Sequence, residues 1–116
     1  MTDNIKLYLV HFKNRHSSES FYKIGITSKY DVLDRFKYDM YNDWNIKVVT
    51  SAYGPRDEVE LAEQKLLKMF PKNLWIEQKI SGVTEIVKLS SIQLEQCMKL
   101  IKGYSQQWYA MRMQHE

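Results

Sequence analysis

The sequence contains one cysteine, Cys97, and no cluster of cysteines and histidines. A single cysteine cannot form an internal disulfide framework and fits a reducing compartment. The missing cluster excludes a structural zinc site of the usual spacing. No apolar run approaches the length needed to cross a bilayer, and residues 1–4 lack the pattern of a secretory signal. We therefore expect an untargeted cytoplasmic protein with no membrane partner.

What is present is the composition of one compact domain. The 116 residues leave no room for a second domain of ordinary size. Hydrophobic residues make up 44% of the chain, enough for a sizeable core, and a charged share of 27% is typical of folded proteins. The net charge of +3 permits a polyanionic partner without requiring one.

Four segments have the character of β-strands. Residues 5–12 are almost wholly apolar, which predicts a strand buried on both faces. Residues 21–27 follow a polar, basic connection, and the two segments together predict an antiparallel hairpin. Residues 46–53 predict a third strand, and residues 84–89 predict a short extended piece.

Three further segments predict helices. Residues 31–41 begin with an aspartate that can cap a helix. Residues 57–70 carry apolar side chains at helical spacing, and Pro71 ends that helix. Ser91 supports a plain N-cap rather than a full capping box for the last helix, which we expect to break at Gly103.

This order of elements predicts an α+β fold with a small central antiparallel sheet of about three strands, flanked by helices. We expect residues 1–90 to form the core. Residues 91–116 would form a C-terminal helix and a tail rich in aromatic residues and methionine. The tail would pack on the core or on a partner, a second copy of the chain included, since these residue types are enriched at interfaces.

Short motifs along these elements resemble a known family. The strand around Tyr8, Lys-Leu-Tyr-Leu-Val, resembles the GIY strand of the GIY-YIG nuclease superfamily. Residues 22–27, Tyr-Lys-Ile-Gly-Ile-Thr, resemble its YIG strand and are similar to a compact, phage-associated branch. Arg35 on the first helix and Leu-Ala-Glu ending at Glu63 on the second follow in family order, and residues 84–87 resemble the closing segment. The resemblance covers roughly residues 6–90.

The resemblance implies a metal-dependent DNA endonuclease. Such a reaction needs an aimed water, a proton acceptor and positive charge near the phosphate. By the resemblance, Glu63 would be the ligand of a single Mg²⁺ or Mn²⁺ ion, and Arg35 would hold the scissile phosphate. Tyr8 would orient or deprotonate the attacking water. Tyrosine is a poor base near neutral pH, so Lys23, in the place of the YIG tyrosine, would supply positive charge.

The sequence departs from the family pattern at two positions, and only the second of them concerns activity. Lys6 stands at the glycine of the GIY strand, and Leu67 stands where the compact branch has a histidine, a ready proton carrier. Supporting positions complete the expected site. Tyr22 flanks Lys23, and Gly25 allows close backbone approach. By the resemblance, Tyr38 would substitute for the histidine as a hydrogen-bond donor, and Asn73 would take the place of a late polar residue of some relatives.

Plainer interpretations stay open for each residue. A tyrosine on an apolar strand is usually core, a strand lysine can be solvated at an edge, and Glu63 can pair with a neighbouring lysine on its helix. The alternative function is a catalytically impaired nucleic-acid-binding or regulatory module of the same fold. Its phosphate contacts would come from basic residues along the chain: Lys13, Arg15, Lys29, Lys37, Lys65 and Lys72.

Overall fold

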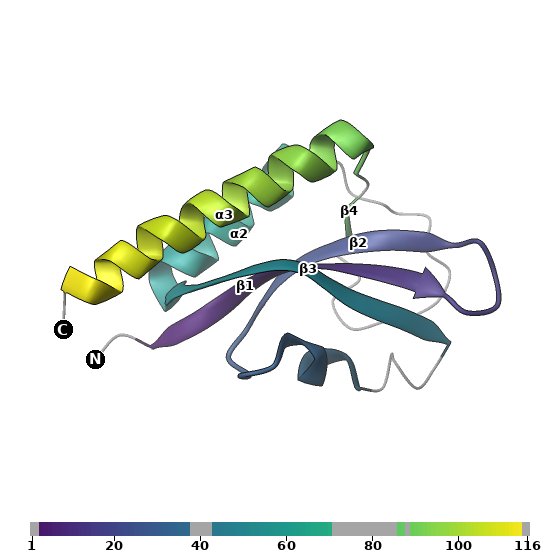
Figure 1. Ribbon diagram of the computed structural model, residues 1–116, viewed down its shortest axis with the longest axis horizontal. Helices are drawn as coiled ribbons and strands as arrows, with labels where there is room; N and C mark the ends of the chain where they lie inside the picture. Colours follow the sequence, from purple (N-terminus) through teal and green to yellow (C-terminus); the bar gives the residue numbers. More distant parts are fainter. Residues whose placement is uncertain (1–2, 38–42, 71–85, 88, 115–116) are drawn as a thin grey trace.

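The computed structural model describes residues 3–37, 43–70, 86–87 and 89–114. Its sheet has the strand order β3-β1-β2-β4, and every neighbouring pair is antiparallel. With the helices this makes an α+β fold around a central antiparallel sheet, which confirms the predicted fold class (Figure 1). The elements in chain order are β1 (Asn4–Asn14), β2 (Ser20–Thr27), η1 (Val32–Phe36), β3 (Trp44–Pro55), α2 (Arg56–Met69), β4 (Ile86–Val87) and α3 (Ser91–Gln114).

The central strand β1 is buried on both faces, as its apolar run predicts. Side chains alternate across a strand, so Leu7 and Leu9 enter one hydrophobic cluster while Tyr8 and Val10 enter another. Helices α2 and α3 cover the first face of the sheet, and η1 lies at the second (Figure 1). We call these the helix face and the η1 face.

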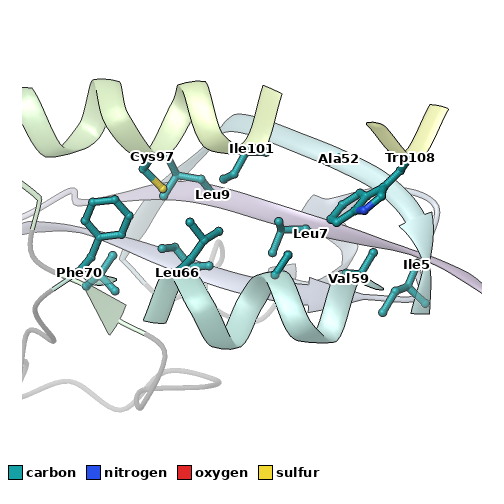
Figure 2. Close-up of a cluster of buried hydrophobic side chains, with 13 residues drawn as sticks. Ile5, Leu7, Leu9, Ala52, Val59, Leu66, Phe70, Cys97, Ile101 and Trp108 are labelled. Carbon is teal, nitrogen blue, oxygen red and sulfur yellow. The ribbon is translucent and has the colours of Figure 1, made fainter. Parts of the chain in front are cut away.

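The core on the helix face joins the sheet to both long helices (Figure 2). Leu7 and Leu9 are fully buried there, and α2 and α3 each contribute a stripe of buried side chains at helical spacing. These stripes are Val59, Ala62 and Leu66 from α2, and Cys97, Ile101 and Trp108 from α3.

The core on the η1 face is mainly aromatic. Phe12 stacks on Phe21 with ring centroids 4.8 Å apart, and Phe36 from η1 meets Phe12 edge-on at 5.2 Å. Trp44 packs edge-on against both Phe12 and Phe21. Such contacts add to the burial of apolar area, and they hold η1 against the sheet beside Tyr8.

The first predicted helix is confirmed at its cap and differs in type. The Asp31 side chain accepts a hydrogen bond from the backbone N–H of Leu33 at 3.0 Å. Between Val32 and Phe36 the turn is a 3₁₀ helix rather than an α-helix, with Val32 and Phe36 buried. The end of the predicted helix, near Tyr41, lies outside the described residues.

Helix α2 agrees with its predicted bounds to within a residue. It ends at Met69, and Phe70 adopts an extended conformation with φ −109° and ψ 140°. A residue that precedes a proline is disfavoured in the helical region, which explains why the helix stops one residue before Pro71.

The predicted break at Gly103 is wrong. Helix α3 continues through Gly103 to Gln114. Glycine lowers helix propensity by about 1 kcal/mol relative to alanine, but Ile101 and Trp108, on either side of it, are buried in the same core. Packing against the sheet therefore overrides the local preference, and Gly103 lies at an open position.

The expectation of a plain cap at Ser91 is also wrong. Ser90 forms a full capping box with Gln93. The Ser90 hydroxyl accepts from the backbone N–H of Gln93 at 3.2 Å, and the Gln93 side chain accepts from the backbone N–H of Ser90 at 3.0 Å. The sequence contains this Ser-x-x-Gln pattern, but it starts at Ser90, one residue before the serine that was expected to cap the helix.

The tail after Gly103 is part of this helix. Trp108 is buried against the sheet, whereas Tyr109 and Met113 are exposed. A partner contact through these exposed side chains stays a prediction. In the part of the chain that the structure describes, no helix combines the length and apolar character required to cross a membrane.

We predict that Cys97 is unreactive in the folded protein. Burial raises the pKa of its thiol from 9.0 to about 12, so the thiolate fraction at pH 8 falls roughly a thousandfold. Labelling by iodoacetamide, followed by mass spectrometry, is expected to be slower by a similar factor than in urea-unfolded protein. Equal rates in the two states would show that the α3 contact with the sheet opens readily.

Candidate functional site

The centre of the sheet contains a buried tyrosine–lysine pair on the η1 face. In the β1–β2 ladder Tyr8 lies opposite Gly25, and Lys23 lies opposite Val10. The Lys23 ammonium Nζ donates a hydrogen bond to the Tyr8 hydroxyl at 3.0 Å. Both side chains are 0% exposed, so the bond forms inside the protein.

Aromatic rings surround the ammonium group of Lys23. Its ammonium lies 4.9 Å from the centroid of the Phe36 ring and 5.4 Å from that of the Tyr8 ring. Aromatic faces attract a cation at such distances, and a buried ammonium is costly unless polar and π groups surround it. The interpretation of Lys23 as a solvated edge residue is therefore wrong.

Tyr8 is both a core residue and the partner of this charge. Its ring meets Phe36 edge-on, with centroids 5.5 Å apart and planes at 90°. Phe36 thus contacts both members of the pair and separates them from solvent on the η1 side. Arg35, the preceding residue, is exposed. Residues Tyr8, Lys23 and the η1 segment that carries Arg35 are consequently close in the fold.

Glu63 lies on the other layer of the molecule. Helix α2 carries it, and the buried side of α2 packs into the core of the helix face. The Glu63 side chain is half-buried. Leu67, at the position of the family histidine, packs against the same core. The structure thus brings Tyr8 and Lys23 together and places Glu63 on a helix that covers the opposite face.

The structure describes two of the expected supporting residues, Gly25 and Tyr22. Gly25 lies opposite Tyr8 on the neighbouring strand. Tyr22 is half-buried in the core of the helix face, away from the Tyr8–Lys23 pair. Tyr38 and Asn73, together with the basic residue Lys72, lie outside the described residues.

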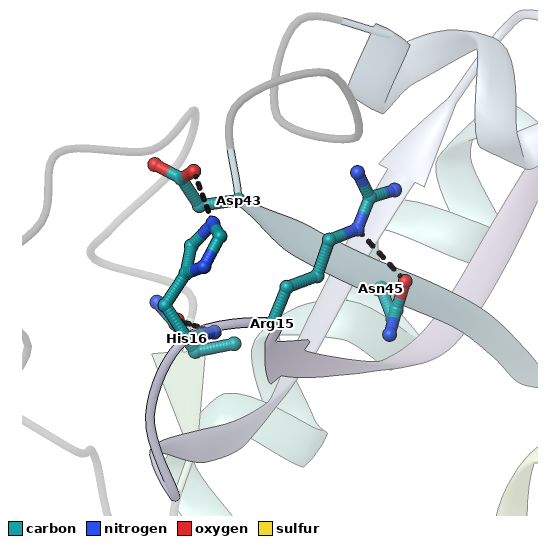
Figure 3. A network of polar contacts seen from close by, with 5 residues as sticks. Arg15, His16, Asp43 and Asn45 are labelled. Carbon is teal, nitrogen blue, oxygen red and sulfur yellow. Dashed lines mark hydrogen bonds and ion pairs between the residues drawn. The ribbon is translucent and has the colours of Figure 1, made fainter.

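The turn between β1 and β2 contains polar contacts that the sequence does not reveal (Figure 3). Arg15 Nε donates to the Asn45 side-chain oxygen at 3.0 Å, and His16 Nε2 lies 2.9 Å from the Asp43 carboxylate. The partners are about 30 residues apart in the chain, and only the pairing of β1 with β3 brings them together. Arg15 and His16 remain exposed.

The other predicted phosphate contacts are spread over the molecule. Lys13 lies with Arg15 at the β1–β2 turn, whereas Lys29 follows the opposite end of β2. Lys37 is 3.7 Å from Asp34 beside η1, and Lys65 is exposed on α2. Because these residues lie on both layers and at both ends of the sheet, they do not form one basic face.

The expected divalent ion needs acidic side chains as ligands. Among residues 3–37, 43–70, 86–87 and 89–114, no group of three or more histidine, cysteine or acidic side chains is placed to hold a metal. Mg²⁺ commonly takes one or two carboxylates and completes its shell with water and substrate phosphate. A half-buried Glu63 fits that role as a single protein ligand.

His11 is half-buried and packs against Tyr22, with ring centroids 4.8 Å apart. Burial lowers the pKa of its imidazole, and the neighbouring Lys13 and Lys47 lower it further. A neutral, packed imidazole is typical of a structural residue.

Fold and site together define a class: an α+β protein whose antiparallel sheet contains a buried tyrosine–lysine pair. Comparison with protein-family models gave no match. Neither the curated proteins nor the solved structures gave a significant match.

Proposed function

We propose that the protein is a metal-dependent DNA endonuclease of the GIY-YIG type, acting in the cytoplasm of a host cell if it is phage-encoded. The observation that supports this most directly is the 3.0 Å hydrogen bond from Lys23 to the Tyr8 hydroxyl. The family resemblance assigns these same two positions to the chemistry. The two residues are 15 positions apart in the sequence, and the sheet brings them into contact.

The pair suits the activation of water. An ammonium beside a phenol oxygen stabilises negative charge that develops there as the proton leaves. Once its own proton has passed to a solvent water, Tyr8 would accept a proton from the attacking water, with Lys23 as its electrostatic partner. Arg35, exposed on η1, would hold the scissile phosphate with its planar guanidinium. A divalent ion bound at Glu63 would supply positive charge at the leaving oxygen, which requires the phosphate to come within reach of α2 on the helix face as well as of Arg35.

Access of DNA to this pair requires a movement. Tyr8 and Lys23 are 0% exposed, and Phe36 packs on both. Displacement of the short η1 segment would uncover them, and it would also move the adjacent Arg35. The proposed enzyme therefore cleaves only when η1 moves, with the substrate phosphate at Arg35 as the natural trigger.

The test is cleavage of duplex and branched DNA in Mg²⁺ or Mn²⁺. Tyr8→Phe and Glu63→Ala are each expected to reduce the rate by at least about a hundredfold, since they remove a proton acceptor and the metal ligand. Glu60→Ala, also on α2, is the matched control and should cleave normally. Absence of cleavage with either metal, or equal rates for Glu63→Ala and Glu60→Ala, would contradict the proposal.

The second candidate is a nucleic-acid-binding module that has the fold and lacks the reaction. The observation in its favour is the placement of Glu63 on the layer opposite the fully buried Tyr8 and Lys23. Leu67 in place of a histidine agrees with it. DNA binding that weakens steeply with salt, without scission in either metal, would establish this function instead.

A further inference from the structure

A cavity of about 450 Å³ opens at the end of the sheet where β1 begins and β2 ends. Two lysines and two tyrosines, Lys6, Lys29, Tyr30 and Tyr53, line it together with the hydroxyl side chains of Thr27 and Ser28. Its volume lies within the usual range of small-ligand sites. Among the described residues that line it are neither Tyr8 nor Lys23, so it is a separate place in the fold.

The cavity has a positive charge balance. Within the described part of the chain its lining contains Lys6 and Lys29 and no carboxylate. Neighbouring acids are engaged elsewhere, because Asp31 caps η1 and Asp3 lies 3.6 Å from Arg56. A concave site with cations of one sign favours an anionic ligand.

Lys6 is positioned to contact that anion. It lies in one row with Thr27 and Tyr53, its partners on the two neighbouring strands. Its ammonium donates to the backbone carbonyl of Tyr30 and lies 4.9 Å from the centroid of the Tyr30 ring. An ammonium has three N–H donors, so the bond to this carbonyl leaves donors for a ligand oxygen.

Tyr30 offers an aromatic surface beside these charges. The residue is 92% exposed even though the Lys6 ammonium lies over its ring. The backbone N–H of Lys29 donates to the Thr27 hydroxyl at 3.1 Å, which fixes the turn before Tyr30. Exposed aromatic rings next to lysines are what proteins use to stack a base while binding its phosphate.

We propose that this cavity binds a nucleotide, with its phosphate at Lys6 and Lys29 and its base stacked on Tyr30. The proposal does not rest on phosphodiester hydrolysis, because it holds equally for a protein that only binds DNA. A free mononucleotide and a nucleotide within a single strand present the same base and phosphate. The chemistry of the site is common to both sources.

The first test titrates the full chain separately with four ligands and monitors the chemical shifts of its backbone amides by NMR. The ligands are deoxyadenosine monophosphate, deoxyadenosine, inorganic phosphate and a six-residue oligodeoxyadenylate. The monophosphate is expected to shift the amide signals of Lys29 and Tyr30 until the change reaches a plateau. It should bind about tenfold more tightly than deoxyadenosine or phosphate alone. Tighter binding of the oligonucleotide than of the monophosphate identifies a strand as the source. Equal or weaker binding identifies the free nucleotide.

Variants decide whether the cavity is responsible. Lys6→Gln and Lys29→Gln are each expected to weaken binding of the monophosphate by about tenfold. Lys99→Gln on α3 is the matched control and should bind like the wild type. Tyr30→Leu should weaken binding while Tyr30→Phe retains it. Phosphate that binds as tightly as the monophosphate, or lysine variants that all behave like Lys99→Gln, would overturn the proposal.

Discussion

Replacement of Gly54 by alanine is expected to destabilise the fold by about 1–3 kcal/mol, the usual cost of overpacking a core. A β-carbon at Gly54 would lie 2.6 Å from Cγ and Cδ2 of Trp108 and 2.8 Å from its Cβ. The tryptophan cannot rotate away, because its own β-carbon is among the contacts. Trp108 is 1% exposed, so the backbones of α3 and β3 must move apart to relieve the clash.

The measurement is the midpoint of urea unfolding, with Gly103→Ala as the matched control. Gly103 lies within α3 and has nothing within 4 Å of its added β-carbon. That substitution is expected to stabilise the protein by about 0.5–1 kcal/mol, because alanine has the higher helix propensity. Equal effects of the two glycine substitutions would contradict the packing of Trp108 on β3.

Strand and helix positions were predictable from the sequence where one physical signal acts alone. The apolar run around Tyr8 specifies a strand buried on two faces, and the spacing of Val59, Ala62 and Leu66 specifies one face of a helix. Gly103 misled because two signals compete there. Local propensity indicates a break, whereas burial of Trp108 beyond it, visible only in three dimensions, keeps the helix intact.

The candidate site was predictable only in part. A hairpin prediction places Tyr8 and Lys23 on adjacent strands, but the register that joins their side chains depends on the turn and on the packing of both faces. The location of Glu63 depends on which face α2 covers, and strand order alone does not determine this. The nucleotide cavity was missed because the sequence marks Lys6 only as a departure from a family glycine, Tyr30 lies in no motif, and the two meet only through the fold.

The second large effect is expected at the Tyr8–Lys23 pair. Tyr8→Phe removes an acceptor from a fully buried ammonium and is expected to lower the free energy of unfolding by about 1.5–3 kcal/mol. Lys23→Met removes the charge and leaves an unbranched apolar side chain of similar length. The double variant has no buried ammonium that needs an acceptor. Its loss of unfolding free energy should therefore be smaller than the sum of the losses in the two single variants.

The comparison is a double-mutant cycle measured by urea unfolding at neutral pH, with a coupling of about 1 kcal/mol or more expected. Tyr109→Phe, at an exposed ring, is the control and should change stability by less than about 0.5 kcal/mol. Strictly additive losses would mean that the hydrogen bond contributes little.

The same four proteins separate structure from chemistry, because a pair that serves only the core leaves cleavage of DNA unchanged in every folded variant. A pair that activates water loses cleavage in Tyr8→Phe, in Lys23→Met and in the double variant alike, even though the double variant loses less stability than the sum of the two single losses.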